Sequence, residues 1–350
     1  MPVWPLRVFS VVATLVAAYP VFAAAPVEQF TLDNGMEVIV LPNHRVPAIS
    51  HMLWFRVGSA DDPQGKSGLA HYHEHIMFKG SRNYKSGEYA DIIARNGGQQ
   101  NAFTGYDATS YFVNIAKENL PLVMQLEADR VRGLTPSDGD AEKERQVIIE
   151  ERRERTENNP QALLDEQMNT MLYRHHPYRI PVIGWMHEME GLTKKDVLNF
   201  HKAYYHASNA ILIVSGDITA HELKPMAEKY YGNLPKMPVP QRNWLAEPPQ
   251  RAARHITLNH PNVKQPEWTR SYMTSSFSYG NKKEALPLFL VSQLIGGGKT
   301  SHLYRTIVVD KKLATAIDTS FNGFSAGPAE FVISAMPEAG VSLQVLEAAI

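Results

Sequence analysis

Three residues that could bind and use a metal ion, His71, Glu74 and His75, stand close together early in the chain. Their spacings of three and four residues place all three side chains on one face of an α-helix. Neutral imidazoles are zinc ligands, and a carboxylate beside a zinc ion can act as the base that activates water. The order His-x-x-Glu-His is a catalytic arrangement, and it is complete only when it is read from His71. We therefore expect half of a catalytic zinc site, unless the histidines cluster by chance on a solvated helix.

The composition limits what else the protein can do. The chain has 350 residues, of which 44% are hydrophobic and 20% charged, enough for a sizeable core and two domains. Its formal net charge is -1, which gives no broad basic surface for nucleic acid. It contains no cysteine, so thiolate zinc sites, disulfides and cysteine nucleophiles are excluded. Any zinc ligands must therefore be histidines and carboxylates.

Residues 1–23 have the pattern of a secretory signal peptide. Arg7 is followed by a mostly apolar run from Val8 to Phe22, and Ala23 could end a cleavage site. The run is shorter than the roughly 20 residues that a membrane span needs. We expect export, most simply to a bacterial periplasm, without a stable membrane span.

Patterns of alternation and turn residues predict the elements around the motif. Apolar and polar residues alternate on both sides of Asp33-Asn34-Gly35, which predicts a β-hairpin. A third strand is expected at Ile49–Val57, and Ser67 is expected to cap the helix that carries His71. The further elements expected in this half are a helix at Glu88–Arg95, a strand at Asn101–Ile115, and helices at Leu120–Val131 and Ala141–Thr156.

The long helix expected at Ala141–Thr156 could supply a third ligand. Most of its charges fit a solvated face with ion pairs between successive turns. Glu144 and Glu151, however, are two helical turns apart and project from nearly the same face. If this helix returns beside the first, a carboxylate from it completes a His-His-Glu set. His73 lies about 200° around the first helix from His71 and is expected to be a bystander.

Together these residues resemble the family of pitrilysin, insulysin and the mitochondrial processing peptidase. The resemblance begins with the inverted motif at His71 and the acidic run Glu142–Glu151. The further matching segments are Asn101–Thr104, His176–Tyr178, Pro181–Gly184 and Tyr204–Asp217. The resemblance covers about residues 27–350, and it points to a short, exported bacterial branch of that family.

The resemblance implies a role for each matching residue. The implied ligands of a single zinc ion per chain are His71, His75 and Glu151. The implied general base is Glu74, and Glu144 is implied as a supporting acid near the metal helix. An extended substrate would add, by backbone hydrogen bonds, to a strand. The residues of that strand are Asn101, Ala102, Phe103 and Thr104.

The rest of the chain predicts a second, related domain. A proline-rich linker at 234–254 separates a zinc-bearing domain at 27–233 from residues 255–350. Strands are expected at His255–Leu258 and Glu267–Phe277, and a helix at Lys283–Leu294. As in the family it resembles, the chain is expected to have an α+β fold of two related domains. Each would be a mostly antiparallel sheet with helices packed on one face, and together they would form half of a clamshell chamber.

A glycine-rich run, Gly296-Gly297-Gly298-Lys299-Thr300, invites comparison with a phosphate-binding loop. That motif needs a glycine where Gln293 stands, and a strand rather than a helix before it. The run instead resembles the Gly-Gly-x-x-Ser-x-Leu signature of the family's second domain, with Ser301 and Leu303 in place.

Three positions depart from the family pattern. His302 stands where Arg is usual, and Val308 and Thr315 stand where active members have an Arg and a Tyr that hold substrate. In the short bacterial branch of that family, a homologous subunit that lacks zinc ligands can supply the missing pair, so we expect such a heterodimer or, as the alternative assembly, a homodimer. Ser342–Ile350 begins an amphipathic helix without a cap or stop signal, so we expect the second domain to be truncated.

The sequence thus predicts a zinc-dependent endopeptidase that hydrolyses extended or unfolded peptides. The alternative is a non-catalytic binding or scaffold subunit of a peptidase-like complex, which the departures at Val308 and Thr315 favour mildly. The intact motif from His71 to His75 argues against that alternative.

Overall fold

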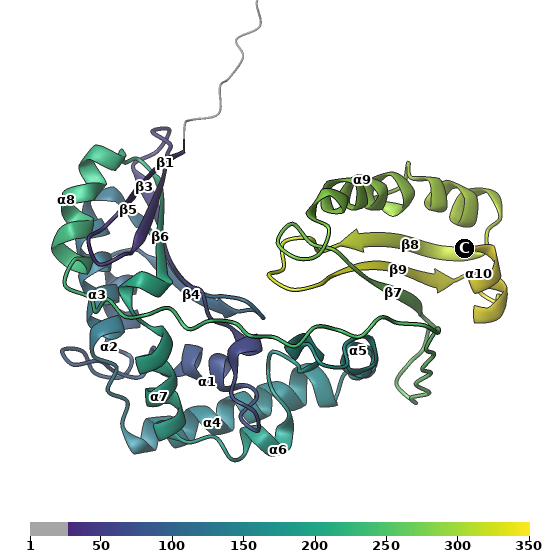
Figure 1. Ribbon diagram of the computed structural model, residues 1–350, viewed down its shortest axis with the longest axis horizontal. Coiled ribbons are helices and arrows are strands. Elements are labelled where there is room, and N and C mark those ends of the chain that lie inside the picture. The colour runs from purple at the N-terminus through teal and green to yellow at the C-terminus, as the bar shows by residue number, and fades with distance from the viewer. Residues whose placement is uncertain (1–26) are drawn as a thin grey trace, which may run out of the picture.

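A six-stranded sheet forms the first half of the molecule (Figure 1). The computed structural model describes residues 27–350, so the signal peptide predicted at 1–23 lies outside the described residues. The strand order is β1-β2-β6-β3-β5-β4, in which β2 and β6 pair in parallel and the other neighbours pair antiparallel. The strands are β1 Glu28–Thr31, β2 Glu37–Pro42, β3 Ala48–Phe55, β4 Gln99–Thr104, β5 Thr109–Ala116 and β6 Ala210–Gly216.

One face of this sheet is buried under helices. In β3 the side chains of Ile49, Leu53 and Phe55 are buried and alternate with less buried neighbours, as the two-residue period of a strand requires. Each such side chain stabilises the fold by about 1.5–3 kcal/mol. Figure 1 shows α2, α3 and α8 on the same side of the sheet. The helices of this half are α1 Leu69–Ile76, α2 Glu88–Arg95, α3 Leu120–Arg132, α4 Asp138–Arg152, α5 Pro160–Leu172, α6 Met186–Met189, α7 Lys194–Tyr204 and α8 Ala220–Tyr231.

The motif helix α1 is capped by a residue that lies outside it. Gly68 precedes the helix with φ of 83°, and a Cβ there would lie 2.5 Å from the carbonyl oxygen of Ile183. A glycine is therefore required at the start of α1. The Asp62 carboxylate accepts hydrogen bonds from the backbone N–H groups of Gly68 and Ala70. These are two of the donors that the start of a helix leaves unpaired, so Asp62 fixes this end of α1.

The second half repeats part of the first. Its sheet has the order β7-β9-β8 with antiparallel pairing, which matches the order β3-β5-β4 of the first sheet. Its elements follow one another along the chain as β3, α1, α2, β4, β5 and α3 do. They are β7 Trp268–Thr274, α9 Ala285–Gly296, a π-helical segment Tyr304–Asp310, β8 Ala314–Phe321, β9 Ala329–Pro337 and α10 Leu343–Ala349. The predicted α+β fold with two related, mostly antiparallel sheets is confirmed.

An irregular segment between α8 and β7 joins the halves, and side-chain contacts fasten it. The Arg242 guanidinium of this segment donates two hydrogen bonds to the Asp61 carboxylate. The Asp107 carboxylate accepts bonds from the Tyr178 hydroxyl and from the backbone N–H of Ala326. The connection between β8 and β9 is thereby held against the turn between β4 and β5. Among the described residues, no helix has both the length and the apolar composition needed to cross a membrane.

Two predictions about strands were wrong. The strand predicted at Asn101–Ile115 is in fact two strands, because a turn forms in which the Gly105 N–H bonds to the carbonyl of Ala108. Glycine and aspartate in this stretch are turn residues that outweigh the β-branched residues around them. The residues at His255–Leu258 do not form a strand and are exposed. A strand needs a neighbouring strand that pairs with its backbone N–H and C=O groups, and a local residue pattern does not show whether such a neighbour exists.

Two predictions about helix caps were also wrong. The Ser67 hydroxyl does not cap α1 but accepts a hydrogen bond from the backbone N–H of Trp185. The last helix, predicted to lack a cap, is capped by Ser342, whose hydroxyl accepts a bond from the N–H of Val345. Serine is a favoured cap, but tertiary contacts decide which serine meets a helix start.

Candidate metal centre

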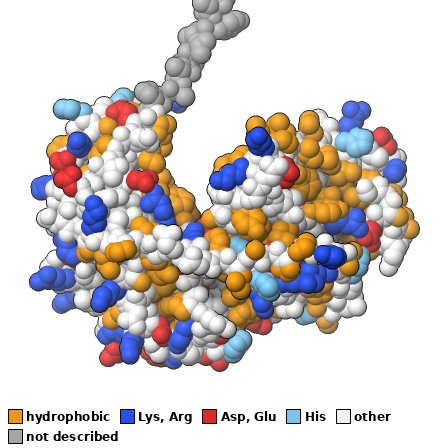
Figure 2. All heavy atoms as spheres, in the orientation of Figure 1, with side chains coloured by type: hydrophobic (Ala, Val, Ile, Leu, Met, Phe, Trp, Pro, Cys, Tyr) orange, Lys and Arg blue, Asp and Glu red, His pale blue; other side chains and the backbone are white. Residues whose placement is uncertain are grey.

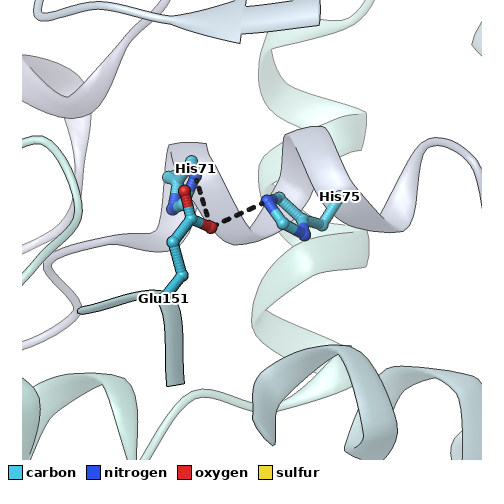
Figure 3. Close-up of side chains that lie close together, drawn as sticks. All are labelled: His71, His75 and Glu151. Atoms are coloured by element: carbon cyan, nitrogen blue, oxygen red, sulfur yellow. Dashed lines mark ion pairs between the residues drawn. The ribbon is translucent and has the colours of Figure 1, made fainter. Parts of the chain in front are cut away.

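The structure brings the side chains of His71, His75 and Glu151 together from two helices (Figure 3). The histidines are on α1, and Glu151 is in the last turn of α4, which packs beside α1. The Glu151 Oε2 atom lies 3.7 Å from His71 Nε2 and 3.5 Å from His75 Nε2. One nitrogen or oxygen atom from each residue lies within 4.8 Å of the other two. The three residues predicted to bind zinc are therefore neighbours in space.

The geometry of this donor set fits a zinc ion. Two ligand atoms on a tetrahedral zinc, at bond lengths of about 2.0–2.1 Å, lie about 3.4 Å apart. The oxygen-to-nitrogen distances of 3.5 and 3.7 Å are close to that value. Burial and the neighbouring His75 lower the pKa of His71 to about 4, so its ring is neutral at pH 7, as a ligand must be. With three protein ligands, a tetrahedral ion has a fourth position for water or substrate.

Glu144 lies beside this centre and holds one of its histidines. Its Oε2 atom is 3.1 Å from His75 Nδ1, and its Oε1 atom is 2.6 Å from Lys79 Nζ. A carboxylate on Nδ1 leaves Nε2 of the same ring facing the centre, which is a common arrangement behind metal-binding histidines. Burial opposes the charged form of His75, but the hydrogen bonds to Glu144 and Glu151 raise its pKa to about 9. Without a metal this ring is therefore protonated at pH 7, and a zinc ion would have to displace that proton on binding. Glu144 thus orients His75, and Lys79, a residue that no motif singled out, orients Glu144.

Glu74 faces the edge of the first sheet. Its carboxylate accepts a hydrogen bond from the Thr104 hydroxyl on β4. Burial raises the pKa of Glu74, and the bond from Thr104 partly opposes that rise. A carboxyl group with a raised pKa is suited to taking up and returning a proton near neutral pH. Glu74, the predicted base, is therefore hydrogen-bonded to Thr104, a residue of the strand predicted to bind substrate.

That strand, β4, is the last in the sheet order, so its outer edge has no strand beside it within residues 27–350. The side chains of Asn101 and Phe103 are exposed, whereas those of Ala102 and Thr104 are half-buried. Ala102 and Thr104 lie on the side of α1, where they meet the core and Glu74 respectively. A free strand edge can pair with an extended peptide through backbone hydrogen bonds.

His73 has a different environment from the one predicted. It is turned away from the three predicted ligands, as the helical period requires, but it is fully buried under α7. Its Nε2 atom is 3.0 Å from Nδ1 of His201, and the other nitrogen of His201 is 2.9 Å from the backbone oxygen of Val131. The description of His73 as a bystander was therefore incomplete. No motif or spacing connects residues so far apart in the sequence, so no sequence pattern could have indicated this contact.

The unusual positions of the second half lie on separate elements. Val308 packs against the apolar core of this half from the π-helical segment. Thr315 is exposed on β8, where its hydroxyl accepts a hydrogen bond from Gln265. The glycine run ends α9, and a Cβ at Gly296 would lie 2.5 Å from the side chain of Thr319. The first glycine of the run therefore allows the end of α9 to pack closely on β8.

Comparison with known proteins agrees with this geometry. Residues 38–184 match a family model described as insulinase (peptidase family M16), and residues 191–350 match one described as peptidase M16 inactive domain. The zinc protease PqqE of Helicobacter pylori is 34% identical over 295 residues, which are 82% of this chain and 65% of that protein. An uncharacterized zinc protease of Mycobacterium leprae is 26% identical over 318 residues, which are 89% of this chain and 69% of that protein. The chain thus spans about two thirds of the length of these relatives.

Solved structures give the same result. The crystal structure of a protease from Helicobacter pylori matches with a TM-score of 0.84 and 31% identity, over 93% of this chain and 78% of that one. Pitrilysin matches with a TM-score of 0.72 and 20% identity, over 89% of this chain and 34% of that one, which is a likeness of fold. The predicted resemblance is confirmed, and the chain belongs to the insulinase family of peptidases, family M16.

Proposed function

We propose that the chain is the zinc-bearing part of an endopeptidase that hydrolyses extended or unfolded peptides, with one zinc ion per chain. The observation that carries this proposal is the convergence of His71, His75 and Glu151 on one point. Relatives that are named zinc proteases support the same class of activity. Because the chain spans 65% of the Helicobacter pylori relative, the activity of the whole protein is part of the proposal.

Each residue of the centre has a separate task in this mechanism. His71, His75 and Glu151 would hold a zinc ion, which when bound would supply Lewis-acid chemistry at a peptide carbonyl and lower the pKa of a water molecule towards about 7. Glu74 would take a proton from the water as its oxygen bonds to the peptide carbon, and would return that proton to the amine that leaves when the C–N bond breaks. The Thr104 hydroxyl orients the Glu74 carboxylate through its hydrogen bond. Glu144 holds the ring of His75 from behind.

The outer edge of β4 positions the substrate in the same mechanism. A peptide that pairs with residues 101–104 would run past the Glu74 carboxylate, because Thr104 of that strand donates a hydrogen bond to Glu74. Backbone pairing requires an extended chain and reads little of its sequence. Folded proteins do not present such a segment, so we propose unfolded or flexible peptides as substrates.

A partner subunit completes the substrate-holding part of the proposal. Val308 is packed in the core of the second half and Thr315 is exposed on β8, so neither position supplies the Arg and Tyr of active family members. We infer that a homologous subunit without zinc ligands supplies them; a second copy of the chain could form a homodimer, but it carries the same Val308 and Thr315. We also propose that residues 1–23 direct the protein to a bacterial periplasm, where such peptides occur.

Metal analysis combined with peptide cleavage tests this function. Zinc content by elemental analysis and cleavage of a quenched peptide library are measured for the chain and for Glu151→Gln. We expect about one zinc per chain with cleavage, and loss of both in the variant. Zinc without cleavage indicates that the partner is needed, and adding the partner should restore cleavage. A chain that binds no zinc would instead be a scaffold subunit, a reading that the intact centre does not favour.

A further inference from the structure

A second pair of histidines lies behind the motif helix, separate from the residues proposed to bind zinc. His73 is buried on α1, and His201 is on α7. The His73 Nε2 atom is 3.0 Å from His201 Nδ1, and His201 Nε2 is 2.9 Å from the carbonyl oxygen of Val131. Val131 is next to the last residue of α3, so this carbonyl is one of those that a helix end leaves unpaired. One chain of hydrogen bonds therefore connects α1, α7 and α3.

The partners of this pair determine where its protons are. A carbonyl oxygen can only accept, so His201 carries a proton on Nε2. Burial lowers the pKa of His201 to about 4, so the ring is neutral at pH 7 and its Nδ1 is an acceptor. His73 must then donate from Nε2 to His201. Its own Nδ1 is buried and has no hydrogen-bond partner among the described residues, so the pair holds α1 by a single bond with a fixed direction.

The surroundings of the pair are aromatic. The centre of the Tyr205 ring lies 4.0 Å from the ring centre of His73 and 5.2 Å from that of His201. The ring centre of Phe200 lies 5.7 Å from that of His73. A hydrogen bond is stronger in such a buried apolar environment, and a buried donor or acceptor that loses its partner destabilises the fold. An apolar side chain at position 73 could fill the same space, but it would set neither the distance nor the direction of the contact. The polar pair therefore restricts the orientation of α1 more than apolar packing does.

We propose that the hydrogen bond between His73 and His201 sets the rotation of α1, and thereby holds His71 and His75 in line with Glu151. This inference rests on the proposed function, because it concerns the same metal centre. His73 is two residues from each histidine ligand on a helix of 8 residues, so a rotation that moves one moves all three. A rotation of about 10° moves an atom about 5–6 Å from the helix axis by about 1 Å. Metal centres tolerate about 0.5 Å of displacement, so such a rotation would weaken binding. His73 and His201 are thus positioning residues.

Zinc affinity measured by competition with a chelator tests this role. We expect His73→Leu and His201→Leu each to raise the zinc Kd on the order of tenfold, as loss of supporting bonds at other metal centres does. The double variant should differ little from either single variant, because both changes break the same bond. His201→Gln, which can still accept from His73 and donate to Val131, should recover most of the affinity. The absorption spectrum of the cobalt-substituted chain should change in the leucine variants and return in the glutamine variant.

A buried histidine elsewhere in the same half provides the matched control. His51 on β3 is bonded to the hydroxyl of Tyr231, so His51→Leu should lower Tm without changing the zinc Kd. If His73→Leu lowers Tm and leaves Kd unchanged, the pair is merely structural and the proposal is overturned. If His73→Leu does not fold, equal Kd values for His201→Leu and His201→Gln overturn it instead. Wild-type protein that binds zinc but cleaves no peptide even with the partner subunit added contradicts the proposed function and leaves this comparison of affinities valid.

Discussion

Helices α1 and α9 occupy the same place in two related halves, yet their side chains differ completely. Both follow the first strand of the shared pattern, and α9 contacts β8 as α1 contacts β4. Helix α1 carries the His71 motif, whereas α9 is apolar on every side, with Leu286 56% and Leu294 72% exposed. Figure 2 shows hydrophobic side chains gathered over α9. A place in the fold therefore does not by itself make a metal centre.

A second feature of the first half is the source of the third residue of the proposed metal centre. Glu151 comes from α4, which lies between β5 and β6 in the chain. Within the described part of the second half, no helix corresponds to α4. The elements shared by the two halves end at α3 and α10, and in the first half the next helix, α4, brings the Glu151 carboxylate to the two histidines of α1. The following changes are ordered from the largest expected effect to the smallest.

Changing Glu74 should produce the largest effect on activity. We expect Glu74→Gln to lower kcat/KM about 10²–10⁴-fold, because the amide cannot take a proton from water. The zinc content should remain, since Glu74 is not among the three clustered donors. Leu294→Gln on α9 is the matched control and should alter neither quantity. Turnover retained in Glu74→Gln would show that another group is the base.

The buried ion pair of α3 should produce the largest effect on stability. The Arg130 guanidinium is buried, bonds to both oxygens of Glu127 and lies 4.4 Å from the ring centre of Tyr111. Arg130→Leu leaves the buried Glu127 carboxylate with the hydrogen bond from the Tyr89 hydroxyl but without its positive partner, which should lower the free energy of unfolding by about 3–5 kcal/mol in urea titrations. Replacing both residues with leucine should recover much of that loss. A single variant as stable as the wild type would contradict a strongly coupled pair.

Acid should destabilise the first half through His51. Burial lowers the pKa of this residue to about 4 from 6.5. The unfolded chain therefore takes up a proton that the folded chain does not, so the contribution of His51 is complete above pH 6.5 and is lost as the pH falls towards 4. The loss at pH 4 should approach about 3 kcal/mol. Urea unfolding, measured on protein from which a chelator has removed the metal, gives the free energy of unfolding at each pH. This free energy should depend less on pH in His51→Leu than in the wild type, and an equal pH dependence would contradict the assignment to His51.

The remote cap of α1 should have a smaller effect. Asp62 accepts bonds from two N–H groups at the start of α1, whereas the residue before α9, Glu284, makes no such side-chain bond. Asp62→Ala should lower the free energy of unfolding by about 0.5–2 kcal/mol and weaken zinc binding. Asp62→Asn keeps an acceptor and should lose less. Glu284→Ala should have no comparable effect, and equal losses at both positions would remove the distinction.

The ion pair of the second half should matter least. Arg270 on β7 lies 2.5 Å from Glu347 on α10, but both side chains are more than one third exposed, at 38% and 35%. Water screens such a pair, so Arg270→Ala should change the free energy of unfolding by less than about 1 kcal/mol. Thermal unfolding of Arg270→Ala and of Arg130→Leu, each compared with the wild type, measures the difference between the two losses of stability. A loss as large as that of the buried pair would show that the two halves depend equally on charge.

The sequence alone determined the local parts of this structure. The spacing of His71, Glu74 and His75 places them on one helical face because the period of an α-helix is fixed. The hairpin around Asp33-Asn34-Gly35 and the helix at Glu88–Arg95 were also correct, since turn residues and apolar periodicity act over a few positions. The spacing alone left both Glu144 and Glu151 as candidates for the third ligand, and the family resemblance selected Glu151.

Tertiary structure decided the contacts between distant segments. Which carboxylate meets the two histidines depends on how α4 packs against α1, and the same packing places Glu144 behind His75. The cap at Asp62 and the bond from His73 to His201 also join residues that no local pattern relates. Periodicity gives the direction of a side chain from its own helix, but it does not identify the element on the other side. For that reason the sequence placed His71 and His75 on one face of α1, and only the packed structure showed which residues surround them.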